Sequence, residues 1–125
     1  MKKQIAILGS TGSIGTKALD VVRKHDEHFG VEVLTAFNNA DLLIKQAVEH
    51  KPNVVVIGND KYYTQVFDAL DPLDIKVYAG SRAIEQVLEM DSIEQVVLGI
   101  GGFSGLKPLL SALHNKKRVA LANKE

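Results

Sequence analysis

Short apolar runs alternate along the chain with segments whose apolar residues recur every three or four positions. The runs are continuous, which is typical of strands buried on both faces of a parallel sheet. The recurring segments have the spacing of amphipathic helices. The pattern predicts six strands, over residues 5–8, 31–36, 54–57, 75–78, 95–98 and 118–122, and five helices, starting near residue 16 and over about 40–51, 61–70, 81–88 and 106–113.

The order of these elements predicts the fold class. Strands that alternate with helices form an α/β fold with a doubly wound, mostly parallel sheet and right-handed crossovers, as in a Rossmann-like dinucleotide-binding domain. No long linker or low-complexity segment interrupts the chain, so residues 1–125 are expected to form one domain. In the first helix, the spacing predicts that Ala18, Val21 and Val22 face the sheet.

Composition and charge exclude several classes of protein. Fifteen Lys and Arg residues balance 15 Asp and Glu residues, which argues against a protein that binds nucleic acid. The chain has no cysteine, which excludes disulfides, a thiolate nucleophile and iron–sulfur clusters within it. No apolar run approaches the ~20 residues of a membrane-spanning helix, and no signal peptide is recognisable. We therefore expect no membrane contact and a cytoplasmic location.

A glycine-rich turn joins the first strand to the first helix, over residues 9–15. Gly9 permits a tight turn, Gly12 lets the backbone approach a pyrophosphate, and Gly15 lets the helix pack closely on the strand. The N-terminus of the helix offers free N–H groups to the phosphates, and Thr11 and Ser13 add hydroxyl donors. The turn predicts dinucleotide binding, although a strand–helix turn without a ligand has the same composition.

The end of the second strand bears on the choice of cofactor. NAD-binding proteins usually place an acidic residue there to bind the ribose 2′-hydroxyl, but the first acid in this chain is Asp41. Asn38 and Asn39 could donate hydrogen bonds to a 2′-phosphate, Phe37 could lie against the adenine, and Lys61 or another lysine could assist. The tip therefore favours NADP. The alternative is that the two asparagines only form a turn and cap a helix.

Two further segments follow the last two predicted strands. The glycines of residues 99–105 could let a nicotinamide ring approach the backbone or could serve a tight turn alone. Asn123, Lys124 and Glu125 follow the last strand, at the sheet edge where ligands of open α/β sheets bind. An ordinary polar strand end would have the same appearance.

The glycine turn of residues 9–15, the turn of residues 99–105 with Leu106 and Pro108, and above all the ending Ala-Leu-Ala-Asn-Lys-Glu of residues 120–125 together resemble 1-deoxy-D-xylulose 5-phosphate reductoisomerase. The resemblance covers the whole chain. It implies an enzyme of non-mevalonate isoprenoid synthesis that rearranges 1-deoxy-D-xylulose 5-phosphate and reduces the product with NADPH to 2-C-methyl-D-erythritol 4-phosphate. It also implies a divalent metal (Mg²⁺, Mn²⁺ or Co²⁺) and a homodimer.

The resemblance also implies roles for individual residues. The cofactor would contact Gly9, Thr11, Gly12, Ser13, Ile14, Phe37, Asn38, Asn39, Asn123 and Glu125, and the substrate would contact Lys124. Many members of the family have Gly-Lys-Asn where this chain has Phe37, Asn38 and Asn39, and two small residues where it has Phe103 and Ser104.

The metal-binding and remaining catalytic residues of the family come after the Asn-Lys-Glu motif. We therefore expect residues 1–125 to be the N-terminal NADPH-binding domain, with no catalytic residue, no metal ligand and no activity when isolated. Two alternatives stay open, a stand-alone nucleotide-binding regulatory module and the cofactor domain of an enzyme of the semialdehyde dehydrogenase type.

Overall fold

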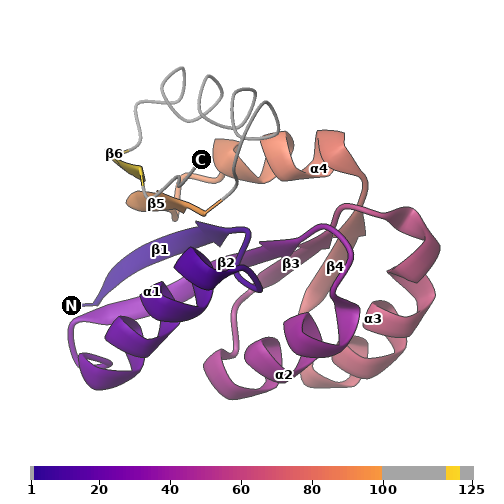
Figure 1. Ribbon diagram of the computed structural model, residues 1–125, viewed down its shortest axis with the longest axis horizontal. Helices are drawn as coiled ribbons and strands as arrows, with labels where there is room; N and C mark the ends of the chain where they lie inside the picture. Colours follow the sequence, from indigo (N-terminus) through magenta and orange to yellow (C-terminus); the bar gives the residue numbers. More distant parts are fainter. Residues whose placement is uncertain (1, 100–117, 122–125) are drawn as a thin grey trace.

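The computed structural model describes residues 2–99 and 118–121, which form a sheet of six parallel strands between two layers of helices (Figure 1). The α/β fold class and the parallel sheet predicted from the sequence are confirmed. The strands are β1 (Lys3–Leu8), β2 (Phe29–Ala36), β3 (Val54–Ile57), β4 (Lys76–Ala79), β5 (Gln95–Leu98) and β6 (Arg118–Leu121). The helices are α1 (Ser13–Lys24), α2 (Ala40–His50), α3 (Tyr63–Leu70) and α4 (Ser81–Gln86), with 3-10 turns η1 (Asp60–Tyr62), η2 (Asp71–Leu73) and η3 (Val87–Glu89).

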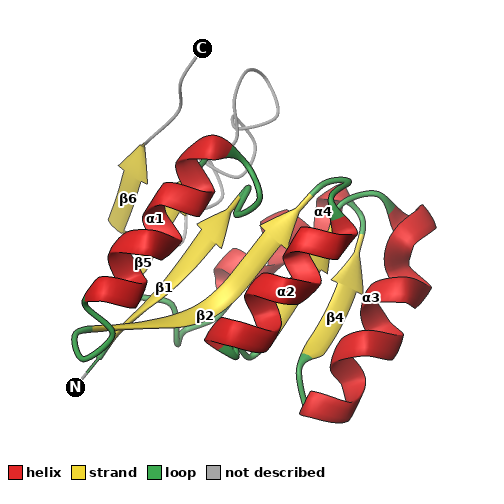
Figure 2. Ribbon diagram, turned by 60° about the horizontal axis from the view of Figure 1, so that its bottom comes forward, coloured by secondary structure: helices red, strands yellow, loops and turns green. Residues whose placement is uncertain are grey.

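The order of strands in the sheet is β4-β3-β2-β1-β5-β6. The chain adds β2, β3 and β4 on one side of β1, and then returns to place β5 and β6 on the other side. Helices α1, α2 and α3 therefore cover one face of the sheet, and α4 covers the opposite face (Figures 1 and 2). Winding reverses between β1 and β5, and ligands of such sheets bind at this point, beyond the carboxyl ends of the strands.

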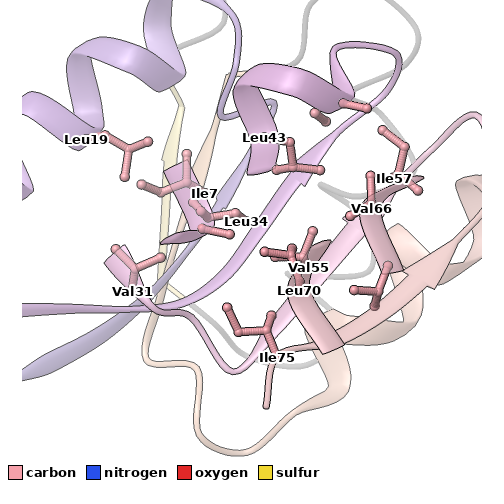
Figure 3. Packing of buried hydrophobic residues seen from close by; sticks show 14 of the residues in the cluster. Ile7, Leu19, Val31, Leu34, Leu43, Val55, Ile57, Val66, Leu70 and Ile75 are labelled. Atoms are coloured by element: carbon pink, nitrogen blue, oxygen red, sulfur yellow. The ribbon is translucent and has the colours of Figure 1, made fainter. Parts of the chain in front are cut away.

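The larger hydrophobic cluster lies between the sheet and helices α1 to α3 (Figure 3). Strand residues alternate between the two faces, so Ile7, Leu34 and Val55 point into this cluster. The second cluster lies on the other face, where Ile84 of α4 and Leu88 of η3 cover Val56 and Leu98. Both faces of the central strands are buried, which explains why their sequences are continuous apolar runs.

A β-bulge interrupts the pairing of β1 with β2. Ile5 pairs with Val31 and Ala6 pairs with Val33, so Glu32 is an extra residue on β2. The Glu32 carboxylate is buried and accepts hydrogen bonds from Asn53 Nδ2 and Ser92 Oγ, each 2.9 Å long. The carboxylate is therefore satisfied by side chains from two later segments, and regular pairing resumes toward the tip of β2.

Helix α1 differs from the sequence-based expectation. It begins at Ser13 instead of near residue 16, and it buries Gly15, Leu19 and Val22, with Ala18 partly buried. Val21, which we expected to face the sheet, is 53% exposed, so this prediction is wrong. The reason is that Gly15 packs directly on the preceding turn, and this contact orients the helix so that Val21 points outward.

The other predicted elements agree with the structure to within about two residues at most ends. The predicted helix 61–70 consists of η1 followed by α3, and helix 81–88 consists of α4 followed by η3. The helix predicted over 106–113 and the segments 100–105 and 122–125 lie outside the described residues. Among the helices described in residues 2–99, none is long and apolar enough to cross a membrane.

Candidate functional site

The glycine turn after β1 is fastened to the neighbouring strand β2. Gly9 has a φ of 78°, a conformation that favours glycine. Its N–H donates to both the carbonyl oxygen and the Oγ1 of Thr35, at 3.0 and 3.1 Å, and the N–H of Ser10 donates to the same carbonyl at 2.8 Å. The chain therefore leaves the sheet abruptly at Gly9 and turns toward the N-terminus of α1.

Beneath this turn, Ser10 and Gln46 form a closed pair of hydrogen bonds. Ser10 Oγ donates to Gln46 Oε1 at 2.7 Å, and Gln46 Nε2 donates to the Ser10 carbonyl oxygen at 2.9 Å. Ser10 is fully buried and Gln46 of α2 is 7% exposed. Gln46 is not among the site residues expected from the sequence. Its signal was a polar residue on the apolar face of a helix, between the buried Leu43 and Ala47.

Three glycines bring backbone segments into close contact at the turn. A Cβ on Gly15 would overlap the carbonyl oxygen of Gly9 and the Cα of Ser10. A Cβ on Gly99, directly after β5, would lie 3.2–3.3 Å from Leu8 O, Gly15 N and Gly9 O. A Cβ on Gly12 would meet its nearest atom, Gly9 O, at 3.6 Å, which is ordinary contact. Gly15 and Gly99 thus serve packing, whereas a methyl group on Gly12 would make only ordinary contacts.

The N-terminus of α1 is the candidate anion site. Gly12 is the N-cap residue, no side chain within residues 2–99 caps the helix, and its first turn contains no acidic residue. Gly12 and Ser13 are exposed and Thr11 is half-buried. The first N–H groups of a helix have no partner inside the helix, and they carry partial positive charge. Here they lie beside Gly99, at the point where the winding of the sheet reverses.

Helix α2 provides a contrast. Asn39 Oδ1 accepts a hydrogen bond from Leu42 N at 3.2 Å, and Asp41 lies in the first turn, so this N-terminus is already capped. Asp41 in turn accepts a hydrogen bond from Gln65 Nε2 at 2.6 Å. The helix-capping role that the sequence left open for Asn39 is therefore present, and of these two N-termini only that of α2 is capped by a side chain of the described residues.

Phe37 and Asn38 lie at the tip of β2, against the segment that leaves β3. Phe37 is 54% exposed, and a Cβ on Gly58 would overlap its ring, so one part of the ring covers Gly58 and the rest is open. Asn38 Oδ1 accepts a hydrogen bond from Asn59 Nδ2 at 2.9 Å. Lys61, proposed from the sequence as an assisting cation, has its ammonium group 5.6 Å from the centre of the Tyr62 ring.

The remaining predicted site residues, Asn123, Lys124 and Glu125, lie outside the described residues. The described part of the chain contains no group of three or more His, Cys, Asp or Glu residues that could bind a metal ion. Within residues 2–99, the structure thus brings together the glycine turn and the first residue of the second glycine turn. It places the tip of β2 separately, at the carboxyl end of the neighbouring strand.

A second feature lies at the opposite end of the strands, where β1 and β2 begin. The side chain of His50, the last residue of α2, is 7% exposed, and its Nε2 has no hydrogen-bond partner among the described residues. Burial lowers the pKa of His50 below its ordinary value of 6.5; the nearby Glu49 opposes this shift and Arg23 adds to it. The imidazole borders a hollow that is lined by Lys2, Val22, Arg23, Asp26, Phe29, Gly30, Val31 and Glu49.

Comparison with known proteins gives one consistent family. Residues 5–125 match the family described as 1-deoxy-D-xylulose 5-phosphate reductoisomerase. Proteins of that name from Phocaeicola vulgatus and Bacteroides fragilis are 50% and 52% identical to this chain. These matches cover 100% and 99% of this chain but only 33% and 32% of the two relatives. The chain therefore spans about a third of the length of these relatives.

Solved structures agree. The Zymomonas mobilis 1-deoxy-D-xylulose 5-phosphate reductoisomerase in complex with NADPH is similar with a TM-score of 0.92 and 31% identity, over 98% of this chain and 32% of that one. A DOX-P reductoisomerase in complex with NADPH, fosmidomycin and magnesium has a TM-score of 0.91 and 31% identity, over 97% of this chain and 30% of that one.

Proposed function

This chain belongs to the 1-deoxy-D-xylulose 5-phosphate reductoisomerase family, and we propose that it forms the part of such an enzyme that binds NADPH. One observation of the structure carries the proposal: the uncapped N-terminus of α1 lies behind a glycine turn at the carboxyl edge of the sheet, where the winding reverses. A solved relative that resembles the whole described fold is in complex with NADPH.

The proposed cofactor site has two described parts. The pyrophosphate binds at Thr11, Gly12, Ser13 and Ile14, where backbone N–H groups and hydroxyls act as donors. The adenosine end binds at the tip of β2, where the exposed part of the Phe37 ring lies against the adenine and the amides of Asn38 and Asn39 face the 2′-phosphate. Contacts of Asn123 and Glu125 with the cofactor, and of Lys124 with the substrate, stay predictions.

For the complete protein, we propose the reaction of the family, the rearrangement of 1-deoxy-D-xylulose 5-phosphate and its reduction by NADPH in isoprenoid synthesis. A divalent metal supplies Lewis acidity in such chemistry, and three similar structures of DOX-P reductoisomerase are in complex with magnesium. The described residues of this chain do not fit a metal site, since they include no suitable group of ligands. Their proposed part is to bind and orient the hydride donor. The homodimer and the cytoplasmic location stay predictions.

Calorimetric titration of the complete protein that contains this chain tests the cofactor proposal. NADPH should bind about 10- to 100-fold more tightly than NADH, since hydrogen bonds to a charged group contribute roughly 1.5–3 kcal/mol. Adenosine 2′,5′-bisphosphate should likewise compete with NADPH better than AMP does. The proposal is contradicted if the protein binds neither NADPH nor NADH. Equal affinities would contradict only the assignment of the 2′-phosphate to the tip of β2.

A further inference from the structure

The segment that leaves β3 fastens the tip of β2 at three consecutive residues. Gly58 N donates to the carbonyl oxygen of Ala36 at 2.7 Å, and Asn59 N donates to that of Phe37 at 2.8 Å. The Asn59 side chain then donates from Nδ2 to Asn38 Oδ1 at 2.9 Å. The first two bonds involve only backbone atoms, so the third is the contact that depends on the identity of residue 59.

The orientation of the Asn59 amide is set from its other side. Its Oδ1 accepts a hydrogen bond from the backbone N–H of Lys61 at 3.1 Å. A backbone N–H can only donate, so the oxygen of the Asn59 amide faces Lys61 and its nitrogen faces Asn38. The same reasoning then fixes Asn38. Its oxygen faces Asn59, and its NH₂ group lies on the other side of the planar amide.

The NH₂ group of Asn38 has no partner within residues 2–99 and 118–121. Asn38 is exposed, so both of its amide hydrogens are available to a ligand at the tip of β2. Three charged residues, Asp41, Asp60 and Lys61, lie within three positions of Asn38 or Asn59 in the sequence. Asp41 is bonded to Gln65, and the Lys61 ammonium lies over the Tyr62 ring. Asp60 is exposed at the start of η1 and adds the one negative charge next to Asn59.

We propose that Asn59 is a positioning residue that makes this site prefer a 2′-phosphate to a 2′-hydroxyl. It does so by turning the donor end of Asn38 outward. An amide nitrogen donates to phosphate oxygens, whereas the reversed amide would present an oxygen that accepts from a hydroxyl and repels a phosphate. This inference rests on the proposed function, because it assumes that the adenosine end of NADPH binds at the tip of β2.

The test compares the affinities of the complete protein for NADPH and NADH in two variants. Asn59→Ala releases the Asn38 amide and should weaken NADPH binding about 3- to 10-fold, with NADH changed less than about twofold, as expected for one charge-assisted hydrogen bond that becomes disordered. Asn59→Asp keeps the acceptor for the Lys61 N–H but replaces the donor by a second oxygen. The Asn38 amide should then reverse, and the preference for NADPH should fall at least as far.

Two controls distinguish the effect of the Asn38 orientation from the effect of an added charge and from a general loss of stability. In an Asn38→Ala background, Asn59→Ala should have no further effect on the ratio of the two affinities. Asn59→Asp should still change that ratio in this background, but only as far as its negative charge repels the 2′-phosphate. Asn53→Ala removes an amide bond of the same length at the opposite end of β3, the bond to Glu32, and should leave the ratio unchanged. Denaturation midpoints identify any variant that has lost its fold.

The outcomes separate this inference from the proposed function. If the unchanged protein binds neither dinucleotide, both fail. The role proposed for Asn59 is wrong if the unchanged protein prefers NADPH and folded Asn59→Ala keeps the same preference. It is also wrong if Asn59→Ala reduces the preference by the same factor in the Asn38→Ala background. In both cases the cofactor proposal is unaffected.

Discussion

Gln46 determines the shape of the glycine turn, although it lies 36 residues away from Ser10 in the sequence. Its amide bonds both the hydroxyl and the carbonyl oxygen of Ser10, and the three groups are buried. A buried polar group that loses its partner costs much more than an exposed one, because water cannot replace the bond. The turn therefore has its conformation before any ligand binds.

We predict that Gln46→Leu lowers the free energy of unfolding by about 1–3 kcal/mol, since it leaves the buried oxygen atoms of Ser10 without partners. The variant should weaken NADPH and NADH binding by the same factor, because the two dinucleotides share the pyrophosphate. Chemical denaturation and calorimetry measure the two effects.

The matched control is Gln65→Leu, which removes a glutamine bond to Asp41 on the exposed surface. Its effect on the free energy of unfolding should stay within about 0.5 kcal/mol. Equal losses in the two variants, or a change in the NADPH preference with Gln46→Leu, would contradict the role given to the buried pair.

At the residue scale, the sequence predicted the glycines but not the side chains that position them. The spacing of Gly9, Gly12 and Gly15 reports a local backbone requirement, so it is visible in a single segment. Gln46 and Asn59 act through partners that are distant in the sequence, and those partners become neighbours only when β1, β2 and β3 assemble into the sheet. A pattern of apolar and polar positions contains no information on such pairs.

At the scale of elements, helix α1 meets the sheet through its first turn. Gly15 packs on the backbone of Gly9 and Ser10, and there is no space for a side chain. Gly12, one turn earlier, has an ordinary φ of −80°, and a Cβ there would come no closer than 3.6 Å to another segment. Gly15 of this motif thus serves packing, whereas the role that we propose for Gly12 is to leave room for the pyrophosphate.

This difference predicts opposite outcomes for two similar substitutions. Gly15→Ala should lower the free energy of unfolding by about 1–3 kcal/mol, as is usual when a packed site receives an extra methyl group. Gly12→Ala should leave the denaturation midpoint nearly unchanged but weaken NADPH binding, because its methyl group occupies the approach of the pyrophosphate. The prediction is contradicted if Gly12→Ala binds NADPH normally, or if Gly15→Ala is as stable as the unchanged protein.

The elements that sequence reasoning found best are the central strands. Val54–Ile57 is a run of four branched apolar residues, and all four are buried. The start of α1 was missed by three residues because a glycine N-cap without a capping side chain gives no sequence signal. The bulge at Glu32 was also missed, since an acidic residue inside a strand does not indicate which later segments will bond it.

For the molecule as a whole, His50 makes stability depend on pH. Burial keeps the pKa of this histidine below 6.5 in the folded state, so the unfolded chain binds a proton more readily. The contribution of neutral His50 is complete above the ordinary pKa. It is lost as the pH falls through the folded pKa, and acid therefore favours unfolding. Lys2, Arg23, Asp26 and Glu49 face the same hollow and set its local charge.

We predict that the free energy of unfolding falls more between pH 8 and pH 5 in the unchanged chain than in His50→Gln, where no such proton is taken up. Denaturation at several pH values measures the two slopes. His28→Gln is the control, because that ring is exposed on the surface, with 69% of its side chain accessible. It should keep the slope of the unchanged chain. Parallel slopes for the unchanged chain and His50→Gln would contradict the prediction.

The position of β1 between two strands that come from distant parts of the chain has a consequence for synthesis on the ribosome. Ile5 pairs with Val31 on one side but with Gln95 on the other. At roughly 5–20 residues per second, the second partner emerges several seconds after the first. During that interval β1 to β4 can pair, but Gly99, which packs against the glycine turn, has not yet been made. The nascent chain therefore acquires α1, α2 and α3 before the glycine turn gains its contact with Gly99.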